Sequence, residues 1–175
     1  MGVYHWNCIE DKQSIIKTLL SEIKYLEPAR RQECVSYIAN HVDSLPDELM
    51  LATDDIKTLY NSGIEIGAHT VNHPIMTCIS EVDAISEMGD SRAQLEEIIG
   101  DTVRFFAYPN GIHGVDYSNV HAKMVKKLGF RAALTTHHGV ANRQSDSAQL
   151  PRFTPWDDKP TRFMLRAAQI YLKTK

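Results

Sequence analysis

Helical and extended segments alternate along this chain from residue 53 onward, and this alternation restricts the fold more than any other feature. Thr53 can begin a short helix through Leu59, and Gly63 can end it. A strand pattern follows at residues 64–68. Further helices are predicted from Ser80 to about Ile99, from Ser118 to Gly129 and from about Thr161 to Leu172, with strands at 103–108 and 130–135. Such an alternation is typical of an α/β protein with parallel strands.

The first 50 residues follow a different pattern. Residues 2–7 are compatible with a short strand. Apolar residues then recur at helical spacing from Asp11 to Leu26, and Pro28 suits the first turn of a second helix. We therefore predict an N-terminal strand and a helical hairpin over residues 1–50, and the α/β part over residues 51–175.

Composition and charge exclude several functional classes. The 175 residues suit one domain, and a net charge of −3 offers no basic surface for nucleic acid. No apolar run approaches the roughly 20 residues of a membrane span, and the N-terminus has no signal-peptide pattern. Cys8, Cys34 and Cys78 are far apart and odd in number, which favours reduced thiols. The cytoplasm is the default expectation for such a chain.

Two histidines four residues apart follow the strand at 64–68. The sequence from His69 to Pro74 is HTVNHP, and Pro74 disfavours a helix at His73. A loop at the carboxyl end of a parallel strand is where α/β folds build their sites, and neutral imidazoles are suitable zinc ligands. We interpret the pair as metal ligands that need at least one further ligand. The alternative is a pair of solvated loop histidines.

A second strand, 103–108, ends in the turn Pro109-Asn110-Gly111. Asn and Gly tolerate positive φ, so this turn can direct backbone N–H groups into a cleft. Such donors stabilise an oxyanion. The alternative is that the turn only ends the strand.

Together, the segments 67–74 and 108–111 resemble the polysaccharide deacetylase family (NodB homology, carbohydrate esterase family 4). His69, Thr70, His73 and Pro74 match the family's second motif. Residues 150–157, LPRFTPWD, resemble the closing segment of a bacterial subgroup, in which the two leading helices resemble an insertion. The implied fold is α/β, a partial or distorted (β/α) barrel of the NodB-homology type with an N-terminal helical hairpin. The implied reaction is hydrolysis of N- or O-acetyl groups of carbohydrates with a divalent metal, usually zinc.

The resemblance also assigns roles to individual residues. It implies that His69 and His73 are metal ligands and that Thr70 fixes their loop. Asn110 takes the position whose backbone N–H holds the oxyanion. Tyr108 and Arg152 are implied to line the substrate groove.

Several features of the family pattern are absent. Its first motif, Asp-Asp-Gly at the end of the first strand, supplies the catalytic base and the third metal ligand, and it has no counterpart here. Asp54 and Asp55 are followed by Ile56, and we predict that they cap a helix instead. No Leu-x-His segment supplies the general acid near the C-terminus. His137 and His138 are the nearest substitutes, and His138 is our candidate catalytic residue; the alternative is a solvated loop pair.

Two functions remain open from the sequence. The first is a metal-dependent carbohydrate deacetylase of which this chain is an incomplete catalytic domain. The second is a non-catalytic member of the family that binds carbohydrate or metal. If the strand with the first motif is missing, the neighbouring strand keeps an open edge, and we expect a homodimer to cover it.

Overall fold

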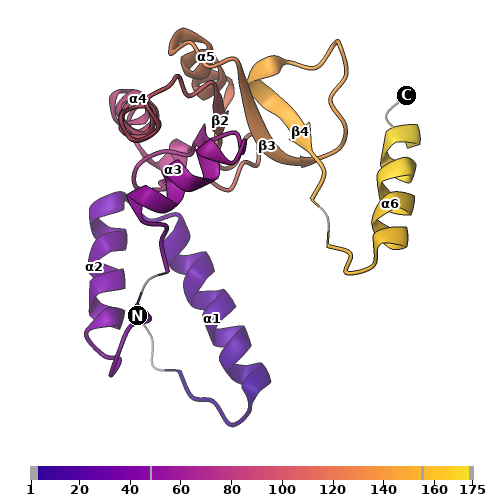
Figure 1. Ribbon diagram of the computed structural model, residues 1–175. Helices are drawn as coiled ribbons and strands as arrows, with labels where there is room; N and C mark the ends of the chain where they lie inside the picture. The colour runs from indigo at the N-terminus through magenta and orange to yellow at the C-terminus, as the bar shows by residue number, and fades with distance from the viewer. Residues whose placement is uncertain (1–3, 48, 155, 174–175) are drawn as a thin grey trace. The chain divides into compact units, whose positions relative to one another are not determined.

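The computed structural model describes residues 4–47, 49–154 and 156–173 (Figure 1). The chain divides into two compact units, one from Met1 to Leu49 and the other from Met50 to Lys175.

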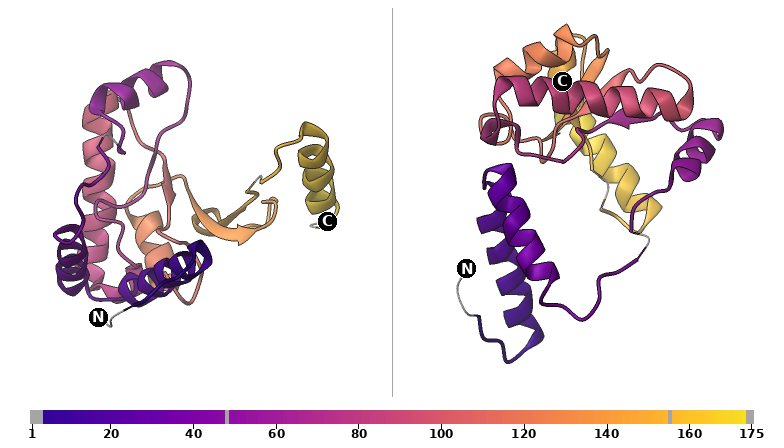
Figure 2. Two further views of the ribbon diagram at one scale, coloured as in Figure 1. Left: turned by 90° about the horizontal axis from the view of Figure 1, so that it is seen from below. Right: turned by 90° about the vertical axis from the view of Figure 1, so that its left-hand side faces the viewer.

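The first unit is a hairpin of α1 (Ile9–Lys24) and α2 (Pro28–Ala39), as predicted. The two helices lie side by side in both Figure 1 and Figure 2. The carboxylate of Glu27 accepts hydrogen bonds from the backbone N–H groups of Ala29 and Arg30 and so begins α2.

The predicted strand at residues 2–7 is not present in the part of it that the structure describes, residues 4–7; residues 1–3 lie outside the described ranges. The Asp11 carboxylate accepts hydrogen bonds from the N–H groups of Asn7 and Cys8 at 2.9 and 3.3 Å. The Asp11 side chain therefore caps α1, and residues 4–7 lead into this cap and form no strand.

Among its described residues, the second unit contains four α-helices, two short 3₁₀ helices (Met76–Cys78 and Ser147–Gln149) and a parallel sheet. Its α-helices are α3 (Thr53–Asn61), α4 (Glu81–Ile99), α5 (Asn119–Lys127) and α6 (Pro160–Lys173). Ser80 caps α4 by accepting the N–H of Asp83, and Gly100 ends it with φ 71°. The cap of α3 is Ala52 and not Thr53, because the Asp55 carboxylate accepts the Ala52 N–H at 2.9 Å. The prediction that this acidic pair caps a helix is therefore confirmed for Asp55.

The four strands are β1 (Gly67–Ala68), β2 (Phe105–Ala107), β3 (Ala132–His138) and β4 (Leu150–Arg152). They pair in the order β1-β2-β3-β4, and every pair is parallel. The predicted α/β fold with a parallel sheet is thus confirmed. β1 and β2 are shorter than predicted, β3 begins later and extends to His138, and β4 was not predicted.

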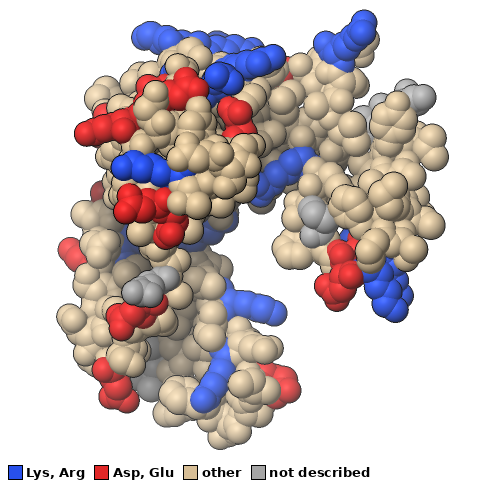
Figure 3. All heavy atoms as spheres, in the orientation of Figure 1, with Lys and Arg blue, Asp and Glu red and all other residues tan. Residues whose placement is uncertain are grey.

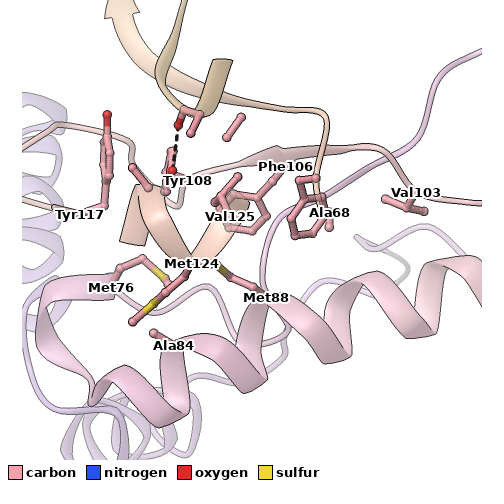
Figure 4. Close-up of a cluster of buried hydrophobic side chains, with 14 residues drawn as sticks. Ala68, Met76, Ala84, Met88, Val103, Phe106, Tyr108, Tyr117, Met124 and Val125 are labelled. Atoms are coloured by element: carbon pink, nitrogen blue, oxygen red, sulfur yellow. Dashed lines mark hydrogen bonds between the residues drawn. The ribbon is translucent and has the colours of Figure 1, made fainter. Parts of the chain in front are cut away.

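The core of this unit lies between the sheet, α4 and α5 (Figure 4). Phe106 of β2, Met88 of α4 and Val125 of α5 are at most 1% exposed. Tyr108 stacks on Tyr117 with ring centroids 3.8 Å apart. The packed core fixes the direction of the strands and hence the edge at which their following loops gather.

The near balance of acidic and basic residues in the sequence is visible on the surface (Figure 3). Acidic and basic side chains both occur over the second unit in Figure 3. The three cysteines are free thiols, as predicted. Among the described residues, no helix has the length and apolar character to cross a membrane.

Candidate functional site

The predicted metal ligands lie in a loop, residues 69–74, that we call the histidine loop. It follows β1 directly, and the imidazole rings of His69 and His73 are 4.8 Å apart and nearly perpendicular. Both side chains are exposed, whereas Pro74 is buried. Thr70 and His73 have φ values of 65° and 50°, so the segment is a loop and not a helix, as predicted.

The ring of His69 is oriented by the neighbouring strand. Its Nδ1 lies 2.7 Å from the carbonyl oxygen of Ala107 at the end of β2. A carbonyl can only accept, so Nδ1 donates in this contact, which in a neutral imidazole leaves the lone pair on Nε2. Metal-binding histidines commonly donate their second ring nitrogen in this way. In this tautomer Nε2 is the ring nitrogen that is able to accept.

The backbone of the histidine loop is held by α4. The Glu87 carboxylate accepts the N–H groups of Val71 and Asn72, both at 2.8 Å. Ser91, one turn further along α4, accepts the N–H of His69 at 3.4 Å. Sequence reasoning missed these two residues. Their spacing of four was the available signal, because it places both on one helical face.

Thr70 also lies where the prediction expects a loop-fixing residue. Its side chain is 9% exposed, and its hydroxyl donates to the carbonyl of His69. This bond lies within the loop, and the role of Thr70 in fixing the loop stays a prediction.

The Pro109-Asn110-Gly111 turn lies at the same edge of the sheet, after β2. Asn110 and Gly111 have φ values of 58° and 74°. The N–H of Thr136 in β3 donates to the Gly111 carbonyl at 3.1 Å, which ties the turn to the next strand. The turn therefore has the positive φ values that the sequence predicts.

Tyr108 does not line a groove. Its side chain is 2% exposed, and its hydroxyl donates to the carbonyl of Ala148 at 2.9 Å. Burial raises the pKa of Tyr108 well above its ordinary value. The side chain lies on the core side with Phe106, whose ring centroid is 5.2 Å away, so the predicted substrate contact is wrong for this side chain.

His138 and Arg152 lie side by side at the ends of β3 and β4. They are register partners in the parallel pair, and both are exposed. His137 and His138 belong to β3 and not to a loop.

A cavity of about 480 Å³ is lined by Gly111, Ile112, His113, Tyr117, Thr135, Thr136, His137, His138 and Gln149. Gly111 of the Pro109-Asn110-Gly111 turn and His138 of β3 therefore line the same cavity. The lining does not include His69, His73 or Arg152.

The residues present fit part of a zinc site. His69 and His73 can supply two nitrogen ligands, but the described residues contain no group of three His, Cys, Asp or Glu placed to hold a metal. A zinc site with protein ligands usually has at least three. The third ligand is therefore not supplied by a described residue in this arrangement.

Known proteins give an independent view of this arrangement. The family model described as polysaccharide deacetylase matches residues 24–133. YxkH of Bacillus subtilis (strain 168), which carries a polysaccharide deacetylase name, is 26% identical over 102 residues; the match covers 58% of this chain and 35% of YxkH.

Two solved structures are also similar. The deacetylase PplD of Streptococcus pyogenes, in complex with acetate, has a TM-score of 0.62 and 23% identity, covering 69% of this chain and 51% of PplD. A polysaccharide deacetylase from Bacillus cereus has a TM-score of 0.58 and 25% identity, covering 74% of this chain and 39% of its own. The chain thus spans between about a third and about half of these relatives. The resemblance seen in the sequence is confirmed: the chain belongs to the polysaccharide deacetylase family.

Proposed function

We propose that this chain supplies the histidine-bearing part of a metal-dependent carbohydrate deacetylase site that hydrolyses N- or O-acetyl groups. The observation that carries the proposal is the pairing of His69 and His73 at the end of β1, with the Nδ1 proton of His69 held by Ala107. In this proposal the two imidazoles hold one divalent metal, with zinc preferred. A bound zinc ion supplies Lewis acidity and a more acidic water.

The remaining residues have roles in substrate binding and proton transfer. The backbone N–H of Asn110 would donate to the oxyanion, since its turn has the required positive φ. His138 would donate a proton to the leaving group, and Arg152, its register partner, would contact the sugar. The cavity lined by Gly111 and His138 would admit the acetylated sugar.

A non-catalytic role is the second candidate, and one observation favours it. The described residues provide no carboxylate beside the two histidines in a three-ligand group. General-base catalysis contributes roughly 10² to 10⁴ in rate, so its loss alone would remove most activity.

Zinc titration tests the metal site. We expect isothermal titration to show one weak zinc site that His69→Ala and His73→Ala each abolish, because each removes one of two nitrogen ligands. His5→Ala serves as the control, since His5 is an exposed histidine of the other unit. Binding that persists in both loop variants would contradict the assignment.

Acetate release separates the two functions. With acetylated chito-oligosaccharides and added zinc, we expect turnover far below the order of 1 s⁻¹ that ordinary enzymes reach, because the usual base is absent. Turnover at that level, lost in His69→Ala, would instead show that this chain is a complete enzyme with another base. No turnover with retained zinc binding would favour the non-catalytic function.

A further inference from the structure

We infer that Glu87 is a positioning residue whose carboxylate holds the histidine loop in the conformation that brings His69 and His73 together. The link to metal binding rests on the function proposed above. Glu87 itself carries no assigned role in that function, and it lies 14 residues or more from both histidines along the chain.

The Glu87 carboxylate is matched to three donors of the loop. One oxygen accepts the backbone N–H groups of Val71 and Asn72, each at 2.8 Å. The other oxygen accepts the side-chain amide of Asn72 at 2.7 Å. All three are short hydrogen bonds to an ionised acceptor, which are stronger than neutral ones. The two bonded amides lie immediately before His73 and thus fix the backbone that carries this imidazole.

The helix gives Glu87 a rigid base. α4 is capped at both ends, and Ala84, Met88 and Ser91 are buried along it. Ser91 accepts the N–H of His69 from the same helical face. Two acceptors one turn apart therefore bind three backbone N–H groups of the loop, at positions 69, 71 and 72.

The loop conformation needs such support. Thr70 and His73 both have positive φ, which is unfavourable for residues other than glycine. They flank the two amides that Glu87 binds. Without the carboxylate, these amides lose their acceptor, and the loop can relax to ordinary backbone angles that separate the two rings.

Amide hydrogen exchange tests this inference without any metal. In Glu87→Ala we expect the amides of Val71 and Asn72 to exchange about ten to a hundred times faster, as for the loss of a hydrogen bond to a charged group. Glu97→Ala is the matched control, because Glu97 is exposed on the same helix. An unchanged unfolding midpoint would show that the effect is local.

Glu87→Gln provides a second variant in case Glu87→Ala folds poorly. Glutamine keeps one acceptor oxygen, but its NH₂ group faces a donor of the loop. We therefore expect the amides of Val71 and Asn72 to lose part of their protection from hydrogen exchange. The double variant Glu87→Gln with Asn72→Asp exchanges donor and acceptor between the two side chains. We expect it to recover protection that each single variant loses, a rescue that a nonspecific packing role would not give.

Zinc titration of the same variants links Glu87 to the metal. We expect zinc affinity to fall about ten- to a hundredfold in Glu87→Ala, as for other groups that orient metal ligands, and to stay unchanged in Glu97→Ala. Unchanged exchange at positions 71 and 72 in Glu87→Ala would overturn the inference, as would unchanged zinc affinity in a chain that binds zinc. If the wild-type chain binds no zinc but the amides of Val71 and Asn72 exchange faster in Glu87→Ala, the proposed function is contradicted and the positioning role of Glu87 is supported.

Discussion

Gly111 shows how a single residue can join two parts of the site. It adopts φ 74°, and a Cβ built on it would lie 2.9 Å from the backbone nitrogen of Thr136. That nitrogen donates to the carbonyl of Gly111, so the close approach and the hydrogen bond belong to the same contact. A side chain would therefore strain the turn and separate it from β3.

We expect Gly111→Ala to lower the free energy of unfolding by about 2–4 kcal/mol, from backbone strain together with overpacking. Denaturant unfolding measures the change. Gly114→Ala is a matched control, because Gly114 has a similar φ of 79° but open space around its Cβ. It should cost only about 1–2 kcal/mol, the strain alone. Equal losses in the two variants would contradict the close approach to Thr136.

At the same scale, the sequence predicted the site residues unevenly. The loop that carries His69 and His73 was predicted because a strand end and a proline mark it locally. Glu87 was missed because its role depends on α4 packing beside the loop, a tertiary contact that no local pattern encodes. Tyr108 was placed wrongly because the motif gives a position in the chain and not the side to which the ring turns.

Among the elements, α5 depends on a histidine at its N-terminus. The N–H of Ser118, the cap residue, donates to Nδ1 of His121 at 3.0 Å. Burial lowers the pKa of His121, while the carboxylate of Glu81 and the carbonyl of Met76 act in the opposite direction. The neutral ring is therefore the form that the folded chain prefers.

This pKa shift predicts loss of stability in acid. Above the ordinary histidine pKa of about 6.5, the His121 ring is neutral in both the folded and the unfolded chain, so its full contribution to the free energy of unfolding is present. As the pH falls below about 6.5, the unfolded chain binds the proton more readily, and stability decreases until the pKa of folded His121 is passed. His121→Gln keeps a capping box with Ser118 but cannot titrate, so its unfolding midpoint should fall less between pH 6.5 and 5. His5→Gln, at an exposed position, is the control; equal pH profiles for wild type and His121→Gln would contradict the prediction.

Helices were predicted better than strands for a physical reason. The bounds of α4 follow from Ser80 and Gly100, which act within one turn of the residues they cap. Strand bounds depend on partners far along the chain. β4 was missed because Leu150–Arg152 is extended only through its pairing with β3, and β1 is short because β2 is its one partner in the described sheet.

For the whole molecule, β1 bears on assembly because it is an edge strand of the described sheet. Within the described residues, β1 pairs with β2 on one side, and Ile64 just before it is 50% exposed. Open edges of this kind recruit a further strand. We expect a homodimer, measured by light scattering with gel filtration over a concentration series.

A charge on the edge should weaken that dimer. Ile64→Lys places a lysine three residues before β1, and many proteins use a lysine near an edge strand to block edge pairing. Val82→Lys is the control, since Val82 is 74% exposed and belongs to α4 and not to the sheet. A wild-type chain that stays monomeric at tens of micromolar would contradict the dimer.

The strand order has a consequence for how the chain acquires its structure. Because the strands pair in the order in which they are synthesised, each new strand meets one that has already left the ribosome. Glu87 and the amides it binds are separated by only 15 and 16 residues, so closing this loop costs little chain entropy. We expect Glu87 to hold the backbone of the histidine loop before β2 has emerged, and the ring of His69 to be oriented only when Ala107 of β2 arrives.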